Sequence, residues 1–134
     1  MWPRTVISER LGLAWPLIQA PMASAATPEL AAAVSEAGGL GSLGCANLPP
    51  DELRAQIRAT REATSRSFNV NFFCHEEPAP DPERDARMRA RLAPFYQEFG
   101  IEPPASARSP RPSFHGAQLE VLLEERPPVV SFHF

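Results

Sequence analysis

The sequence contains no lysine and only two cysteines, Cys45 and Cys74. Two cysteines that form no CxxC pair exclude a four-ligand zinc site, and we expect both to be free thiols in a reducing cytoplasm. All basic residues are arginines scattered among Asp and Glu, and the formal net charge is −3. Such a weakly acidic chain excludes the broad basic surface that binds nucleic acids or anionic membranes.

The start of the chain, MWPRTVISER, lacks the charged-then-apolar layout of a secretion signal, and no apolar run is long enough to cross a bilayer. We therefore expect a soluble, cytoplasmic protein with no membrane partner. No G-x-G-x-x-G motif opens the first predicted helix, which disfavours a dinucleotide-binding Rossmann site. What is present, 134 residues of which 43% are hydrophobic, suffices for one small domain with a packed core.

Short apolar runs alternate with helical patterns along the chain. In the first helix Thr27 is the expected N-cap, Pro28 suits the first helical position, and Leu30, Ala33 and Val34 form an apolar stripe. The pattern predicts strands over 16–20, 40–44, 67–73 and 129–134, and helices over 27–39, 48–64, about 82–99, and 117–126 before Pro127. Strands separated by helices favour right-handed parallel βαβ units, in a doubly wound sheet or a (β/α)₈ barrel.

Alternation along the predicted strands separates apolar from polar side chains. Phe68, Val70 and Phe72 share one face of their strand and suit packing under helices. The opposite faces of three strands carry five polar residues near their carboxyl ends, where barrel active sites form: Gln19, Asn69, Asn71, Ser131 and His133. A buried amide or imidazole without a partner costs about 1–3 kcal/mol, so we expect this set to hydrogen-bond something. The competing interpretation is that backbone or water satisfies each of them singly.

Three stretches carry a family resemblance. The segment LGLAWPLIQAPMASAATPELAAAVSEAGGLGSLG resembles the amino-terminal signature of the nitronate monooxygenase family, formerly called 2-nitropropane dioxygenases. SFNVNFF resembles that family's third-strand motif and RPPVVSFHF its fourth-strand motif. QAPM, AGGLGSLG and VNFF in this order are specific, and they are most similar to the bacterial class I branch.

The resemblance implies an α/β fold, namely the first half, about four β/α units, of an FMN-binding TIM (β/α)₈ barrel. Residues 1–134 would be the N-terminal part of a single barrel domain that ends within its fourth strand. The family oxidises alkyl nitronates such as propionate 3-nitronate with O₂, using non-covalent FMN, and releases a carbonyl compound and nitrite. The resemblance implies a homodimer for the complete protein. We expect the 134-residue chain to be a truncated piece that is aggregation-prone and inactive alone.

The resemblance also assigns site residues. Pro21, Met22 and Ala23 would lie against the flavin, and Asn71 matches the family's flavin-binding asparagine. Met22 and His133 would belong to the substrate pocket, whereas the family's catalytic histidine motif lies beyond Phe134. The competing interpretation makes Met22 a core gap-filler and His133 a core histidine bonded to backbone. No metal site is expected, because the His75–Glu77 triplet lacks metal-ligand spacing.

Two alternative functions remain open from the sequence. FMN-dependent enoyl-acyl carrier protein reductases share the AAAVSEAGGLG style of helix and strand, but usually have glycine where this chain has Ala20-Pro21. The other alternative is a non-catalytic half-barrel, either truncated or paired with another chain. Cys45 lies next to a strand end, and we expect it to be an inert buried thiol.

Overall fold

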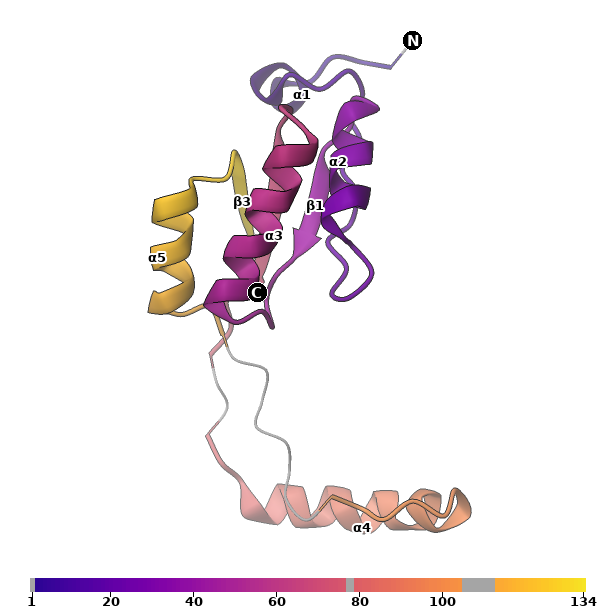
Figure 1. Cartoon of the computed structure of the whole chain (residues 1–134). Coiled ribbons are helices and arrows are strands. Elements are labelled where there is room, and N and C mark those ends of the chain that lie inside the picture. The colour runs from indigo at the N-terminus through magenta and orange to yellow at the C-terminus, as the bar shows by residue number, and fades with distance from the viewer. Residues whose placement is uncertain (1, 77–78, 105–112) are drawn as a thin grey trace. The chain divides into compact units, whose positions relative to one another are not determined.

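The computed structural model describes residues 2–76, 79–104 and 113–134. Helices and strands alternate along most of the chain (Figure 1). The elements are α1 (Val6–Leu11), α2 (Pro28–Glu36), β1 (Gly41–Gly44), α3 (Pro50–Ala63), β2 (Phe68–Phe73), α4 (Pro82–Glu98), α5 (Gly116–Glu125) and β3 (Val129–His133). No described helix is long and apolar enough to cross a membrane.

The chain divides into two compact units. The first holds residues 1–75 and 112–134, and with them every strand and every described helix except α4. The second holds residues 76–111 and contains α4. In this second unit Asp81 caps α4 by accepting a hydrogen bond from the backbone N–H of Arg84, and the apolar side chains of Met88, Leu92 and Phe95 are exposed.

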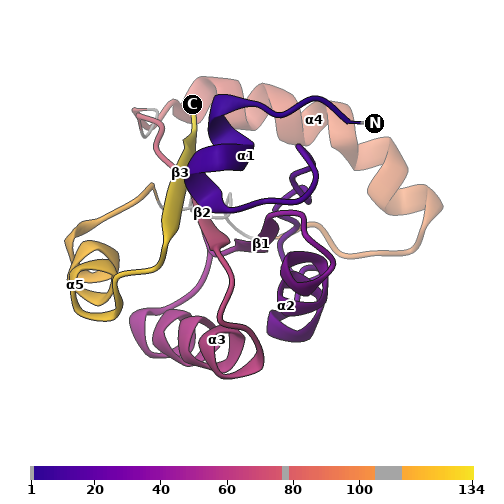
Figure 2. The ribbon, with the colours of Figure 1, turned by 90° about the horizontal axis from the view of Figure 1, so that it is seen from above.

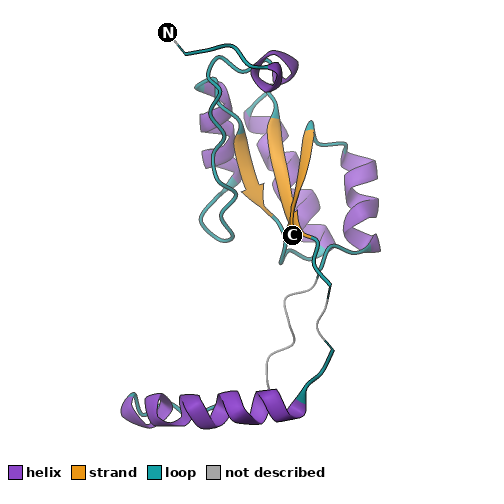
Figure 3. Ribbon diagram, turned by 180° about the vertical axis from the view of Figure 1, so that it is seen from behind, coloured by secondary structure: helices purple, strands orange, loops and turns teal. Residues whose placement is uncertain are grey.

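A parallel three-stranded sheet, in the order β1-β2-β3, organises the first unit. Ser42 pairs with Asn69 across the first ladder, and Asn71 pairs with Ser131 across the second. Helices α2, α3 and α5 run along one face of the sheet (Figure 2). From behind, the strands lie in front of these three helices (Figure 3). The predicted α/β fold with parallel strands is therefore confirmed.

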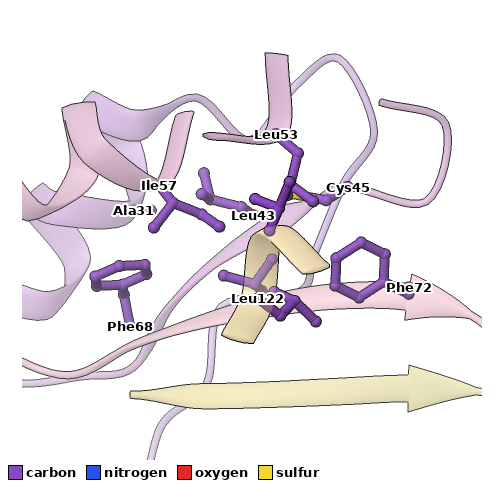
Figure 4. Packing of buried hydrophobic residues seen from close by; sticks show 10 residues of the cluster. Ala31, Leu43, Cys45, Leu53, Ile57, Phe68, Phe72 and Leu122 are labelled. Atoms are coloured by element: carbon purple, nitrogen blue, oxygen red, sulfur yellow. The ribbon is translucent and has the colours of Figure 1, made fainter. Parts of the chain in front are cut away.

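The hydrophobic core lies between the sheet and these helices (Figure 4). As predicted, Phe68, Val70 and Phe72 of β2 point to this side and are buried. They pack with residues of β1, of the three helices and of the segment after β1: Ala31, Leu43, Cys45, Leu53, Ile57, Val121 and Leu122. The even spacing along β2 thus commits one strand face to the core and leaves the other to Asn69 and Asn71.

The predicted first strand, 16–20, is reduced to a single parallel bridge between Ile18 and Leu40. Its two backbone bonds run from Gln19 N–H to the Leu40 carbonyl and from Leu40 N–H to the Leu17 carbonyl. A longer ladder cannot form, because Leu17 N–H turns back to the Trp15 carbonyl and Pro21 has no N–H to donate. The prediction of a full strand here is wrong for this local reason.

Helix α2 begins as predicted, with Thr27 Oγ1 accepting from Leu30 N–H, but its buried face differs. Leu30 and Ala33 are exposed, and Ala31, Ala32 and Ser35 are buried instead. The reason is the close approach of α2 to β1, since a Cβ on Gly41 would lie 1.8 Å from the Ala31 carbonyl oxygen. Only small side chains fit between α2 and β1 at so short a separation. The helix therefore buries its small residues and not the predicted apolar stripe.

The sequence pattern did not predict α1. This helix begins in a reciprocal capping box, in which the side chains of Thr5 and Ser8 each accept from the other's backbone N–H. It ends after one and a half turns at Gly12, whose φ of 68° is left-handed. A six-residue helix has too few positions for an apolar period to be visible.

Candidate functional site

A hollow of about 250 Å³ lies on the sheet face that α2, α3 and α5 leave uncovered. Pro21, Asn71 and His133, three of the predicted site residues, line it together. The remaining lining comes from the same strands and from the bridged segment: Ile18, Leu40, Asn69, Val129, Ser131 and Phe132. The expectation that polar residues of separate strands converge on one face is therefore confirmed.

Gln19 connects the bridged segment to β1 through its side chain. Its Nε2 donates to the Ser42 carbonyl at 3.2 Å, and its Oε1 accepts from Ser42 N–H at 3.3 Å. Ser42 is buried, so both of its backbone groups need partners. The side-chain amide thus makes the pair of bonds that a peptide group of a neighbouring strand would have made.

Asn69 continues this polar layer on β2. Its Nδ2 donates to Ser42 Oγ at 3.2 Å, and its side chain is buried. Its Oδ1 is buried and has no hydrogen-bond partner among the described residues. Such an oxygen is costly to leave unsatisfied, and it belongs to a residue that lines the hollow.

Asn71 stands at the centre of a second group of polar residues. Its Nδ2 donates to Ser131 Oγ at 2.8 Å and to the Ser131 carbonyl at 3.2 Å. Its Oδ1 lies 3.2 Å from Nδ1 of His133. Asn71 is buried and His133 is exposed, so the group joins the sheet interior to the surface of the hollow. The alternative of a buried core His133 is therefore wrong.

Met22 and Ala23 do not line the hollow, but the structure places them beside the end of β1. A Cβ on Gly44 would lie 2.7 Å from Ala23 N and 2.8 Å from Met22 C, so the main chain of this segment passes directly over that glycine. Met22 is 40% exposed. Within this chain Met22 therefore lies at the surface and not in the hydrophobic core.

Ser42 is a site residue that the sequence analysis missed. It bonds Gln19 through its backbone and Asn69 through its hydroxyl. The signal for it was present in the strand 40–44, because alternation places Ser42 opposite the core residue Leu43. From the sequence, a serine between Gly41 and Leu43 indicates only a small strand residue. Its pairing with Asn69 in the sheet shows that it faces the polar layer.

Cys45 lies away from the site, within the hydrophobic core. Burial, with a smaller contribution from the nearby charge of Glu52, raises the pKa of Cys45 to about 12. The expectation of a buried thiol is confirmed, and the raised pKa disfavours the thiolate, which is the reactive form. Among the described residues no cluster of His, Cys, Asp and Glu could hold a metal ion, and Glu77 of the His75–Glu77 triplet lies outside them.

Comparison with known proteins identifies the family to which this chain belongs. Residues 4–134 match the family model described as nitronate monooxygenase. The chain is 48% identical over 126 residues to the nitronate monooxygenase of Pseudomonas aeruginosa, an alignment that covers 92% of the chain and 36% of that protein. It is 47% identical to the nitronate monooxygenase of Paraburkholderia phytofirmans, covering 34% of that protein.

Two solved structures are similar to this chain along nearly its whole length. A nitroalkane oxidase from Streptomyces ansochromogenes superposes with a TM-score of 0.73 at 36% identity, over 97% of this chain and 36% of that one. FabK from Thermotoga maritima superposes with a TM-score of 0.62 at 31% identity, over 97% of this chain and 30% of that one. The chain therefore spans about a third of the length of the relatives that it matches.

Proposed function

The chain belongs to the nitronate monooxygenase family, and we propose that it supplies the N-terminal part of an enzyme that oxidises alkyl nitronates, such as propionate 3-nitronate, with O₂. The products are a carbonyl compound and nitrite. Family membership supports an oxidoreductase, and the nitroalkane oxidase neighbour is consistent with a nitrogen-containing carbon acid as substrate.

The proposal includes a fold, the first half of a single (β/α)₈ barrel. It is supported by the parallel order β1-β2-β3, with α2, α3 and α5 along the same face of the sheet. In a barrel the opposite face is the interior, and the active site lies at the carboxyl ends of the strands. The hollow that contains Asn71 and His133 lies on that opposite face.

The proposed cofactor is FMN, and the described residues fit a flavin ring. Asn69 Oδ1 is a buried acceptor without a partner among the residues that the structure describes, and a flavin ring carries an N–H that can donate to it. The main chain of Pro21, Met22 and Ala23 runs beside the same face at the end of β1. When bound, FMN supplies the electron transfer between nitronate and oxygen, which protein side chains cannot perform.

The chain's own residues would then bind the flavin ring and orient the nitronate beside it. Pro21, Met22 and Ala23 would form one wall against the ring, with Met22 offering an adaptable apolar surface. Asn71 retains a free lone pair on Oδ1 for a ring N–H, and Asn69 offers a second acceptor. His133 would hold the anionic end of the nitronate, and with Met22 would line the substrate pocket. Because the nitronate is already charged, positioning is the main requirement.

One observation carries the proposal: Pro21, Asn71 and His133, remote in sequence, line the same hollow on the same sheet face. Family resemblance assigned each of them separately, and the parallel register of β2 and β3 brings Asn71 and His133 to the same face. Their convergence is what a flavin with substrate stacked beside it requires.

The test uses the complete product of the gene that encodes this chain. FMN is titrated in while its absorption spectrum is recorded, and O₂ uptake and nitrite release from propionate 3-nitronate are then measured. His133→Gln is expected to raise KM for the nitronate, and His75→Gln, which alters a histidine outside the hollow, serves as control. Absence of nitrite from flavin-loaded protein, together with NADH oxidation by an enoyl thioester, would replace the proposal with the reductase alternative.

A further inference from the structure

The hydrogen bonds around Asn71 determine the orientation of its side-chain amide. The Ser131 carbonyl accepts only, so the group that faces it at 3.2 Å must be the NH₂ of Asn71. Ser131 Oγ, at 2.8 Å from the same nitrogen, adds a second acceptor. A flipped amide would place Oδ1 against the carbonyl oxygen, which cannot donate, and would lose that bond. Ser131 therefore directs Asn71 Oδ1 toward β3's other polar side chain, His133.

The orientation of Asn71 in turn selects the tautomer of His133. Oδ1 is an acceptor, so Nδ1 of His133, 3.2 Å away, must carry the hydrogen. A neutral ring with its hydrogen on Nδ1 has its lone pair on Nε2. A protonated ring keeps the same Nδ1–H bond and gains its second hydrogen at Nε2. For Nε2 no partner is recorded within the described residues.

We infer that Asn71 and Ser131 are positioning residues that confine the exchangeable proton of His133 to Nε2. One ring nitrogen is held by the sheet, and the other is left for a ligand in the hollow. This assigns to Ser131 a role that rests on its carbonyl and hydroxyl together, and to Asn71 a role apart from any contact with flavin.

The consequence for the substrate rests on the proposed function. A nitronate oxygen approaching Nε2 meets either a lone pair or an N–H, and no other donor on the ring is available to it. With Nε2 protonated, the contact is a charge-assisted hydrogen bond to the anion. If Nδ1 were free as well, the anion could bind in two orientations. Confinement to Nε2 therefore gives the substrate one orientation.

The test reads the tautomer directly, without flavin or substrate. The complete gene product is labelled with ¹⁵N-histidine, and long-range proton–nitrogen correlations are recorded at a pH where the ring is neutral. The signal that His133→Gln removes identifies the ring of His133. The wild-type ring is expected in the Nδ1–H form. Asn71→Leu is expected to shift the population toward Nε2–H, and Asn71→Asp, which keeps an acceptor, to restore Nδ1–H.

Two variants separate positioning from general disruption. Asn69→Leu alters an amide on the same strand face that makes no bond to His133, and the tautomer is expected to stay unchanged. Ser131→Ala removes one of the two acceptors of Asn71 and is expected to give a smaller shift than Asn71→Leu. A wild-type ring in the Nε2–H form, or the same tautomer in wild type and Asn71→Leu, would overturn the inference.

The outcome is independent of the enzymatic proposal. Nδ1–H in the wild type with no nitrite release would retain the positioning role and remove the nitronate. Nitrite release with an Nε2–H ring would support the nitronate as substrate and reject the positioning role of Asn71 and Ser131. Should Asn71→Leu fail to fold, the wild-type spectrum and Asn71→Asp still decide the question.

Discussion

The side-chain amide of Gln19 lies against the backbone of Ser42 and bonds both its N–H and its carbonyl. The Gln19 side chain makes the bonds to β1 that a strand over 16–20 would have made, and that strand does not form. The segment that leads to Pro21 and Met22 is therefore attached to β1 through one amide and one short bridge.

Replacing Gln19 by leucine is expected to destabilise the protein by about 1–3 kcal/mol, because both buried backbone groups of Ser42 lose their partners. Urea unfolding measures the loss, and hydrogen exchange at the Ser42 amide localises it. Gln97→Leu, at an exposed glutamine of α4, is the matched control and should leave stability nearly unchanged. Equal stability of the two variants would show that the Gln19 amide contributes nothing.

Gly44→Ala is expected to displace the main chain of Met22 and Ala23, since the new Cβ would lie under 3 Å from both. If that main chain holds FMN, the dissociation constant should rise by about tenfold, or about 1.4 kcal/mol. Flavin fluorescence titration measures it. Gly116→Ala, whose Cβ would meet nothing within 4 Å, is the control. Unchanged FMN affinity in Gly44→Ala would remove this segment from the proposed flavin site.

Glu125 at the end of α5 carries a pH-dependent part of the stability. Its carboxylate, 8% exposed, bonds Arg58 at 2.7 Å and Arg61 at 3.2 Å, both on α3. The hydrogen bond from Arg58, more than the added bond and charge of Arg61, lowers the pKa of Glu125 below its ordinary 4.5. A lowered pKa gives stability that is present above pH 4.5 and is lost as the pH falls through the folded-state value.

The melting temperature of Glu125→Gln is therefore expected to fall below that of wild type at pH 7 and to converge with it in acid. Thermal unfolding followed by circular dichroism from pH 7 to pH 3 measures this. Glu120 is an exposed carboxylate on the same helix, and the melting temperature of Glu120→Gln should follow that of the wild type at every pH. A constant difference between Glu125→Gln and wild type at all pH values would contradict the ion-pair account.

The two thiols are expected to differ sharply in reactivity. Cys74 is exposed, whereas burial raises the pKa of Cys45 to about 12 from an ordinary 9.0. At pH 9 a thiol reagent should therefore label one cysteine in the folded protein and two after unfolding. Cys74→Ser should show no labelling until it unfolds. Labelling of folded Cys74→Ser at the wild-type rate would mean that Cys45 is accessible.

Much of the architecture was predictable from local patterns. The alternation in SFNVNFF predicted both the core face of β2 and its polar face, because strand geometry leaves no other arrangement for Phe68, Val70 and Phe72 once helices cover one side. Thr27 and Pro28 likewise predicted the start of α2. The convergence of Asn71 and His133 followed from the parity of two parallel strands.

The parts that were missed depend on contacts between remote segments. The buried face of α2 is set by the approach of Gly41 to Ala31, which no periodicity within the helix encodes. The loss of the first strand depends on where Leu17 N–H bonds, and Ser42 acquires its role only through Gln19 and Asn69. The helix over about 82–99 was predicted from its own sequence. The exposure of its apolar residues Met88, Leu92 and Phe95 was not predicted.

On β2, Asn69 and Asn71 alternate with core side chains, so the amides of the hollow are carried by the same backbone as the packed phenylalanines. Each amide is also held on its own face by hydrogen bonds, Asn69 to Ser42 and Asn71 to Ser131. The conformational entropy of these polar groups is consequently lost when the protein folds, before any ligand arrives. A ligand that enters meets acceptors and donors already in place, and its affinity is reduced little by ordering them.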